Sequence, residues 1–285
     1  MSRFSRLYYY ALLGAIGGLI GWQLSNVLGL SFLSNLYLNE VVVGGLIGFS
    51  IGLLIGITEG AFARSPVYAL RAGFTSGLFG LVGGAIGLPI AEGAFQILGG
   101  EEWTRSLGWA IFGALVGLGL GITGGSQVWK PALGGFIGGA VGGALLEVAR
   151  GRLSDPLTGK AIGLGLLGAA VGGFIAAMAL LLSRAWLEVV SGKMKGTEFV
   201  LDKFIHANGP SAYIGSSALK ADIVLPDPDI DPQHALLKGA DSHINIKDMS
   251  RSGTYVNNRK VEQARLQNEQ AIRVGNTMMV YHEKR

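Results

Sequence analysis

Two patterns of apolar and polar positions divide the chain. Up to about residue 190, long runs of Leu, Ile, Val, Ala and Phe with interspersed glycine dominate, whereas short alternating runs follow. Each long run is close to the ~20 residues that an α-helix needs to cross the hydrocarbon core of a bilayer. The pattern predicts an α-helical membrane bundle of about six transmembrane helices, over residues 7–28, 41–60, 68–89, 108–128, 131–148 and 160–182.

The first and third runs each leave a choice. Arg3 and Arg6 precede the first run, as in a signal peptide, but no small-x-small cleavage site closes it, so we interpret it as a retained helix. The third run stays apolar past Pro89, where a helix would kink if it continued.

Glycine recurs every four residues in the second and fourth runs. Residues four apart share one helical face, and glycine on that face lets neighbouring backbones approach closely. Similar glycine-rich segments follow both runs, which indicates an internal two-helix repeat of about 65 residues. The spacing predicts helix packing through Gly44, Gly48, Gly52, Gly56, Gly113, Gly117 and Gly121.

A channel or carrier is the alternative interpretation of these repeats, because repeats that move against each other build many transporters. Transport favours an ionisable residue near the middle of the membrane. Glu59, Glu92 and Glu147 instead lie near the ends of the predicted spans. We therefore prefer packing over transport.

The loop cations indicate an orientation. With the N-terminus in the cytoplasm, eight Lys and Arg residues near the spans lie inside and four lie outside, which agrees with the positive-inside rule. An even number of spans returns the C-terminus to the same side. We expect a multi-pass protein of the inner (cytoplasmic) membrane with both termini cytoplasmic. The four exceptions are Arg105, Arg150, Arg152 and Lys160.

Composition excludes several classes of function. Lys and Arg exceed Asp and Glu by ten to eight up to residue 190 and by thirteen to eleven after it, so no part has the basic face that nucleic acids need. The chain has no cysteine, and its four histidines match no metal-site spacing. We predict no catalytic residues, no metal and no cofactor, and hence no enzyme.

After residue 190 the pattern becomes that of an all-β sandwich. Short runs such as "AYIGSS", "HALLK" and "HINIKD" alternate with turn formers such as "PDPDIDP". The pair "NN" in "YVNNRKV" suits the positive φ of a tight hairpin turn. We therefore predict two domains, a transmembrane domain over 1–190 and a β-sandwich over 191–285.

Three separated segments, "YIGSSALKADIVLPDPDIDPQHALL", "INIKDMSRSGTYVNN" and "QAIRVGN", resemble the forkhead-associated (FHA) domain. The resemblance covers about residues 194–285. It implies an eleven-stranded β-sandwich whose loops at one end bind phosphothreonine peptides, and therefore a protein partner. A multi-span membrane domain followed by such a module also resembles an architecture of bacterial membrane proteins.

Laid on this sequence, the FHA pattern keeps its loop-building positions and loses its ligand-binding ones. Ser216 replaces the phosphate-binding arginine, Asp231 the phosphate-binding serine, and Ser252 the asparagine that holds the peptide backbone. Arg251, Lys220 and Ser217 could supply substitute donors. The scaffold positions that remain are Gly215, His234, Gly253, Thr254 and Asn257.

These losses favour a changed ligand. Phosphothreonine carries nearly two negative charges and prefers charge-assisted bonds, above all from arginine, so Asp231 would repel it. We expect a membrane-embedded scaffold or signalling adaptor that presents a degenerate FHA domain to a protein, phosphorylated or not. The alternative is a channel or carrier regulated by that domain, and the question of a homo-oligomer stays open.

Overall fold

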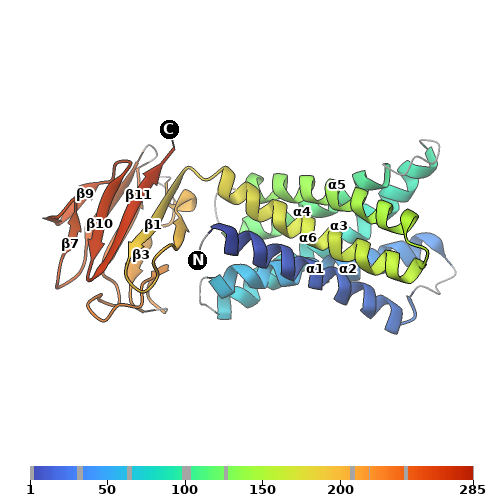
Figure 1. Cartoon of the computed structure of the whole chain (residues 1–285), viewed down its shortest axis with the longest axis horizontal. Helices are drawn as coiled ribbons and strands as arrows, with labels where there is room; N and C mark the ends of the chain where they lie inside the picture. Colours follow the sequence, from blue (N-terminus) through green and yellow to red (C-terminus); the bar gives the residue numbers. More distant parts are fainter. Residues whose placement is uncertain are drawn as a thin grey trace. The chain divides into compact units, whose positions relative to one another are not determined.

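The structure is a computed structural model that describes residues 3–30, 35–62, 66–97, 104–124, 128–205, 209–217, 219–240 and 243–284. The chain forms two compact units (Figure 1). One is helical and comprises Arg6–Phe62 and Pro66–Leu181, and the other includes Leu182–Arg285. Each unit is described separately below.

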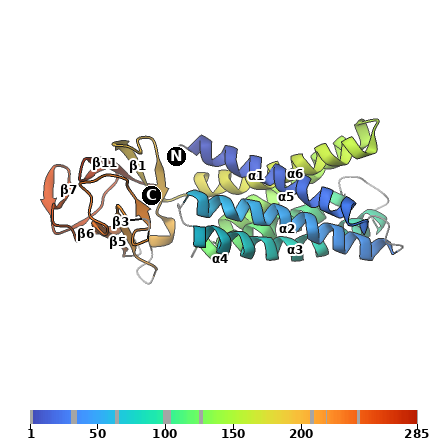
Figure 2. The ribbon, with the colours of Figure 1, turned by 90° about the horizontal axis from the view of Figure 1, so that it is seen from below.

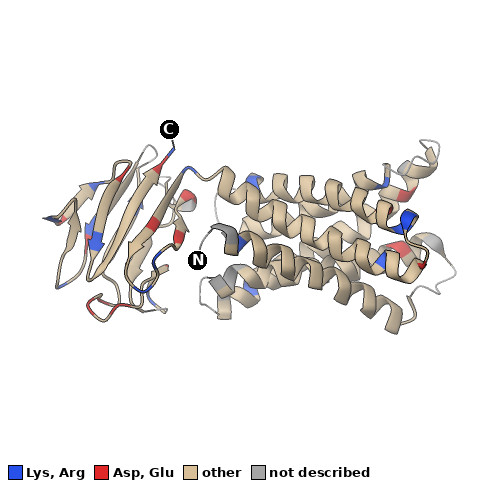
Figure 3. Cartoon of the chain, in the orientation of Figure 1, with Lys and Arg blue, Asp and Glu red and all other residues tan. Residues whose placement is uncertain are grey.

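The helical unit contains six long helices that lie side by side (Figure 2). All six are long and apolar enough to cross a membrane, which confirms the predicted membrane bundle. Charged side chains lie mostly near the helix ends (Figure 3). The helices are α1 (Arg3–Val27), α2 (Leu36–Phe62), α3 (Pro66–Ile97), α4 (Arg105–Gly124), α5 (Trp129–Arg152) and α6 (Pro156–Leu181).

Several helices are longer than the spans that the sequence predicts, with α3 and α5 among them. Helix α3 continues through Pro89 and ends only at Ile97. Helix α5 has 24 residues and includes the polar segment up to Arg152, which the apolar run alone did not contain. In both cases the helix extends beyond the segment that hydropathy identifies.

The helices form a closed ring in which each packs against the next in sequence. Glycine contacts join α1 to α2 at Gly17, α3 to α4 at Gly87, and α5 to α6 at Gly138. The ring closes because α6 returns to α1, where Gly168 lies against the backbone of Gly14. Every helix therefore has two helical neighbours.

The predicted glycine faces lie at two of these interfaces. Gly44 and Gly48 meet the backbones of Gly84 and Gly80 in α3, so a Cβ added at Gly48 would overlap the Gly80 carbonyl. Large side chains would force such helices apart and forfeit their dispersion contacts. The remaining contacts are Gly52 with Ser76, Gly56 with Ala72, Gly113 with Gly135, Gly117 with Pro131 and Gly121 with Val128.

The interior of the ring is filled with apolar side chains. Ile51, Ile55, Phe112, Val116 and Leu167 are all fully buried there. Isoleucine, valine and leucine have no polar atoms with which to coordinate an ion or a solute. The described centre of the bundle is thus a packed core.

The C-terminal unit is a β-sandwich of two sheets. The six-stranded sheet has the order β2-β1-β11-β10-β7-β8 and the five-stranded sheet β4-β3-β5-β6-β9. Apolar residues from both inner faces form the core. The strands are β1 (Ala185–Ser191), β2 (Glu198–Val200), β3 (Ala212–Gly215), β4 (Ile223–Val224), β5 (Ala235–Gly239), β6 (Ile244–Asp248), β7 (Thr254–Val256), β8 (Arg259–Val261), β9 (Gln263–Arg265), β10 (Gln270–Val274) and β11 (Thr277–Glu283).

The predicted domain boundary is too late. Residues 185–190 were assigned to the membrane domain, but β1 belongs to the sandwich and pairs with β11 along its length. Ala185, Leu187 and Val189 point into the sandwich core, whereas Trp186 and Glu188 are partly exposed. The sequence does not reveal where helical periodicity gives way to strand periodicity, because the apolar run of α6 leads directly into β1.

The predicted hairpin turn is confirmed. Asn257 and Asn258 connect β7 to β8 with φ angles of 48° and 64°. Asparagine tolerates this left-handed region better than other residues with a side chain, which explains the pair at the tip.

Candidate functional site

Three loops meet at one end of the sandwich. Strands β3 and β6 both run antiparallel to β5, so both end at the edge where β5 begins. The β3–β4 loop, the β4–β5 loop and the β6–β7 loop therefore lie together. We call these three the recognition loops, and they contain all the peptide-binding candidates of the sequence.

Hydrogen bonds fasten the recognition loops to one another. The Ser216 N–H donates to the Asp231 carbonyl (3.0 Å), and the Gln233 side-chain amide donates to the Lys220 carbonyl (3.1 Å). The Met249 N–H donates to the His234 carbonyl (2.9 Å). Each loop is thus held by its neighbour as well as by its own strands.

His234 is the buried residue that links these loops. Its side chain is fully buried, with Nε2 3.2 Å from the Gly253 carbonyl, and Nδ1 receives the Asp231 N–H at 3.3 Å. Because a carbonyl oxygen only accepts, Nε2 carries the proton in this arrangement. The ring therefore connects the β4–β5 loop to the β6–β7 loop, as expected for a scaffold residue.

Asp248 organises the β6–β7 loop, a role that the sequence analysis missed. Its Oδ1 accepts bonds from the Ser250 N–H (3.1 Å), the Ser250 hydroxyl (2.7 Å) and the Thr254 hydroxyl (2.9 Å). Partial burial opposes the charged carboxylate, but these bonds outweigh it, so the pKa of Asp248 lies below its ordinary value. The signal in the sequence is an aspartate two residues before a serine, the spacing of an Asx turn.

The kept glycines occupy positions that exclude a side chain. Gly215 lies against the Pro232 carbonyl, and Gly253 has a φ of +94°. A Cβ added at Gly253 would also meet the Lys260 side chain, which places this cation from β8 beside the β6–β7 loop. Asn257 accepts the Ala271 N–H on its side-chain oxygen (3.0 Å) and so ties the hairpin to β10.

Asp231 replaces the phosphate-binding serine of the FHA pattern, and its carboxylate accepts a hydrogen bond from a donor within the loops. Its Oδ2 accepts the backbone N–H of Arg251 at 2.8 Å. Ser216, in place of the arginine, donates its hydroxyl to the Ile230 carbonyl at 2.7 Å. Both altered side chains thus bond within the loops.

The other candidates face solvent to different degrees. Lys220, Arg251 and Ser252 are exposed, and Ser217 is partly exposed. The structure brings these four side chains to the same end of the sandwich without joining them into one cluster by any hydrogen bond or ion pair among the described residues.

Two apolar side chains on these loops were not anticipated. Leu219 is 97% exposed and Met249 is 48% exposed. Within the described part of the C-terminal unit, no other large apolar side chain is as open. Both side chains lie on the recognition loops, Leu219 on the β3–β4 loop and Met249 on the β6–β7 loop.

The electrostatic balance of the recognition loops is negative. Residues 216–222, 225–234 and 248–253 contain two cations, Lys220 and Arg251. The carboxylates number five, which are Asp222, Asp227, Asp229, Asp231 and Asp248. With Lys260 of β8 beside the β6–β7 loop, carboxylates still outnumber cations by five to three, which disfavours a dianion.

No group of three or more His, Asp or Glu residues within the described ranges is arranged to hold a metal ion. The prediction that the chain binds no metal or cofactor stays a prediction.

Comparison with known proteins assigns the C-terminal unit. Residues 188–284 match the family model described as "Inner membrane component of T3SS, cytoplasmic domain". The match covers the sandwich that carries the FHA motifs. The C-terminal unit is an FHA-like domain. Domains of this kind are binding modules, and the helical unit places this one on a membrane protein.

Similar solved structures cover the C-terminal part of the chain. The FHA domain of the CT664 protein from Chlamydia trachomatis is 34% identical, covers 36% of this chain and 100% of that chain, and gives a TM-score of 0.32. The cytoplasmic domain of the T3SS sorting platform protein PscD from P. aeruginosa is 20% identical, covers 36% and 82%, and gives 0.32. No curated protein matches the chain in sequence.

Proposed function

We propose that this protein is a membrane-embedded scaffold or signalling adaptor whose FHA-like domain binds a protein partner on the cytoplasmic side without requiring phosphothreonine. The observation that carries the proposal is the bond from the Arg251 N–H to the Asp231 carboxylate. The Asp231 carboxylate, which belongs to the same chain, already accepts this hydrogen bond. A phosphate oxygen would have to displace that carboxylate before it could bind the Arg251 N–H.

The charge balance supports the same conclusion. Tight phosphate binding relies on bidentate arginine and a local excess of donors. Here the arginine position is Ser216, whose hydroxyl bonds to a carbonyl, and five carboxylates surround two cations in the recognition loops. The side chains of Arg251 and Lys220 are exposed, so they can contact a partner segment that carries no phosphate.

The chemistry of the exposed side chains describes the partner. Leu219 and Met249 offer apolar contacts on neighbouring loops, and methionine adapts its shape to irregular surfaces. The acidic loops favour a partner with basic side chains around an apolar anchor. A protein segment of that composition is the occupant that fits.

The helical unit serves this function as an anchor. The loop cations support a topology with both termini cytoplasmic, which places the FHA-like domain inside the cell. A periplasmic alkaline phosphatase reporter fused after Arg285 should be inactive, and an active reporter would contradict this orientation. The filled apolar core of the helical ring supports anchoring over the alternative of a channel or carrier.

The test is a titration of the full-length protein in detergent with a degenerate threonine peptide library and its phosphorylated twin. We expect no preference for the phosphorylated set. The double variant Ser216→Arg with Asp231→Ser restores the two FHA ligand positions, and it should gain affinity for phosphopeptides. Micromolar binding of the wild type confined to phosphorylated peptides would contradict the proposal.

Partner identity is approached by capture from native membranes. The wild type is compared with Leu219→Asp and with Met249→Asp, and Glu269→Ala on the exposed β9–β10 turn serves as the control. A partner that is lost with both loop variants and kept with the control binds at the recognition loops. Equal capture by all four proteins would place the interaction elsewhere.

A further inference from the structure

In the orientation proposed above, on which this inference rests, four cations break the positive-inside rule, and three of them line a single cavity. The cavity has a volume of about 300 Å³ and lies where α4 begins, α5 ends and α6 begins. The fourth cation, Arg152, does not line it. The lining residues are Arg105, Glu147, Arg150, Gly151, Pro156 and Lys160.

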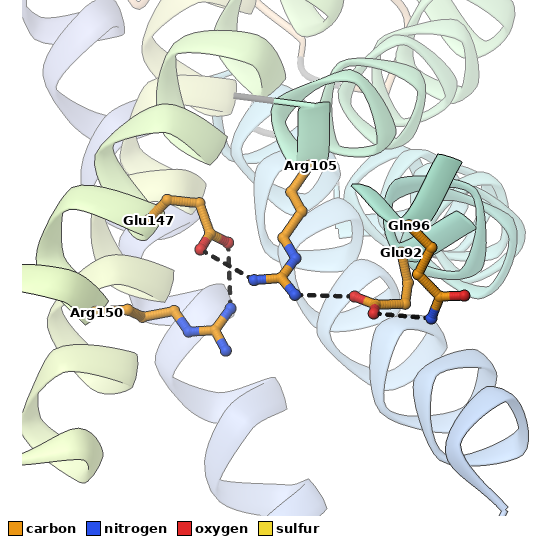
Figure 4. Close-up of polar contacts among 5 residues, drawn as sticks. All are labelled: Glu92, Gln96, Arg105, Glu147 and Arg150. Atoms are coloured by element: carbon orange, nitrogen blue, oxygen red, sulfur yellow. Dashed lines mark hydrogen bonds and ion pairs between the residues drawn. The ribbon is translucent and has the colours of Figure 1, made fainter. Parts of the chain in front are cut away.

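Arg105 forms the fixed wall of this cavity. Its guanidinium lies 3.0 Å from Glu92 and 3.6 Å from Glu147, and it stacks 3.9 Å from the centre of the Phe95 ring. Figure 4 shows the guanidinium between the two carboxylates, which come from α3 and α5. Contacts on three sides hold this charge in one position.

Arg150 and Lys160 form the open wall. Arg150 bonds to Glu147 at 3.1 Å, but its side chain is 40% exposed. Lys160 is exposed and makes no ion pair with any described residue. Both cations therefore have donors left for a ligand.

The lining has three cations and one carboxylate, and Glu92 outside the lining also pairs with Arg105, so one positive charge remains in excess. Glu147 is largely buried and already shared between Arg105 and Arg150. It neutralises part of their charge and leaves the rest directed at the cavity. A ligand with one or two negative charges and several acceptor oxygens complements this arrangement.

The cavity lies at the level where membrane spans end. Helices α4, α5 and α6 all begin or end beside it. Basic pockets between transmembrane helices bind phosphate headgroups on the cytoplasmic side of membranes. The charge-assisted hydrogen bonds on which such binding depends are available to the cations of this cavity as well. We propose that this cavity binds a phosphate group, carried either by an anionic phospholipid or by a soluble phosphate compound. The site accounts for cations on the side of the membrane where the positive-inside rule disfavours them.

The experiment measures lipid retention by native mass spectrometry of the full-length protein. Phosphatidylglycerol is the probe, and diacylglycerol with the same acyl chains but no phosphate is its control. Arg150→Gln with Lys160→Gln should weaken phosphatidylglycerol binding about thirtyfold, because each of the two cations beside the bound phosphate contributes ~1 kcal/mol. Arg152→Gln, which changes a neighbouring exposed cation outside the cavity, should bind within about twofold of wild type.

Several outcomes would overturn the proposal. They are equal affinity for diacylglycerol, equal affinity in the double variant, or an equal loss in Arg152→Gln. If the double variant fails to fold, Lys160→Gln alone replaces it, since Lys160 makes no ion pair with the described residues. Millimolar inorganic phosphate identifies the source: displacement of the lipid indicates a site for soluble phosphate, and persistence of the lipid indicates a headgroup site.

Discussion

The two units of this protein achieve specificity in opposite ways. The helical unit packs backbone against backbone, and its helices meet where side chains are absent, as between Gly48 and Gly80. The FHA-like domain instead fixes its recognition loops through side chains such as His234 and Asp248. In lipid, close contact is the main source of helix association, whereas in water buried hydrogen bonds can hold irregular loops.

The comparison predicts that added volume damages the helical unit most. Gly52→Leu or Gly117→Leu places a branched side chain where a backbone carbonyl lies, and we expect a loss of ~3 kcal/mol in unfolding free energy, the upper end of the usual cost of overpacking. Thermal unfolding of the full-length protein in detergent measures it. Leu54→Ala, on another face of α2, should be milder. Equal tolerance of all three variants would show that glycine contact does not hold the ring together.

Within the FHA-like domain, loss of one buried polar joint should have the next largest effect. His234→Ala removes the link between two recognition loops and leaves the Gly253 carbonyl without its partner, at a cost of ~2–3 kcal/mol. Amide hydrogen exchange should rise first in residues 249–253. His282→Ala, on the partly exposed face of β11, is the control. If amide exchange in residues 249–253 rises equally in both variants, His234 does not link the two recognition loops.

Acid should release the β6–β7 loop. The pKa of Asp248 is lowered in the folded protein, so its contribution to stability is present above the ordinary value of 3.8 and is lost as the pH falls below it. Because the carboxylate is only partly buried and solvent screens its charge, the contribution is below ~1 kcal/mol. Nuclear magnetic resonance of the Gly253 amide between pH 6 and pH 3 follows the change. Asp248→Asn should flatten that titration, and an unchanged curve would exclude Asp248 as its source.

The smallest effect is expected at Arg251. If no phosphate is bound, Arg251→Ala should change partner affinity by less than ~0.5 kcal/mol, because an exposed loop cation contributes little. A loss near ~2 kcal/mol is the result expected of a charge-assisted phosphate bond. Titration with the captured partner measures it, and Lys247→Ala on the exposed surface of β6 is a matched cation control.

Much of the fold could be predicted because two periodicities are unambiguous. Runs of about 20 apolar residues indicated six helices, and alternating runs with turn signals indicated a sandwich. The boundary failed because α6 and β1 are both apolar at their junction, so hydropathy alone does not separate the two periods. Strand β9 was not identified because it has three residues and largely polar side chains.

The candidate site was predicted in position but not in chemistry. Motif order located the recognition loops and the scaffold role of His234. The bond between Asp231 and the Arg251 N–H depends on a backbone group twenty residues away, and the exposure of Leu219 depends on the path of its loop. Neither follows from residue type, since an aspartate or a leucine in a loop has many conformations open to it.

Closure of the helical ring has a consequence for synthesis. Helices α1 and α6 are the most distant in sequence yet they pack together, through Gly14 and Gly168. During insertion, α1 must therefore keep one glycine face against lipid until the last helix arrives, since contacts between distant segments form late. The FHA-like domain is translated directly after α6. Its synthesis thus coincides with the moment at which the membrane unit can become complete.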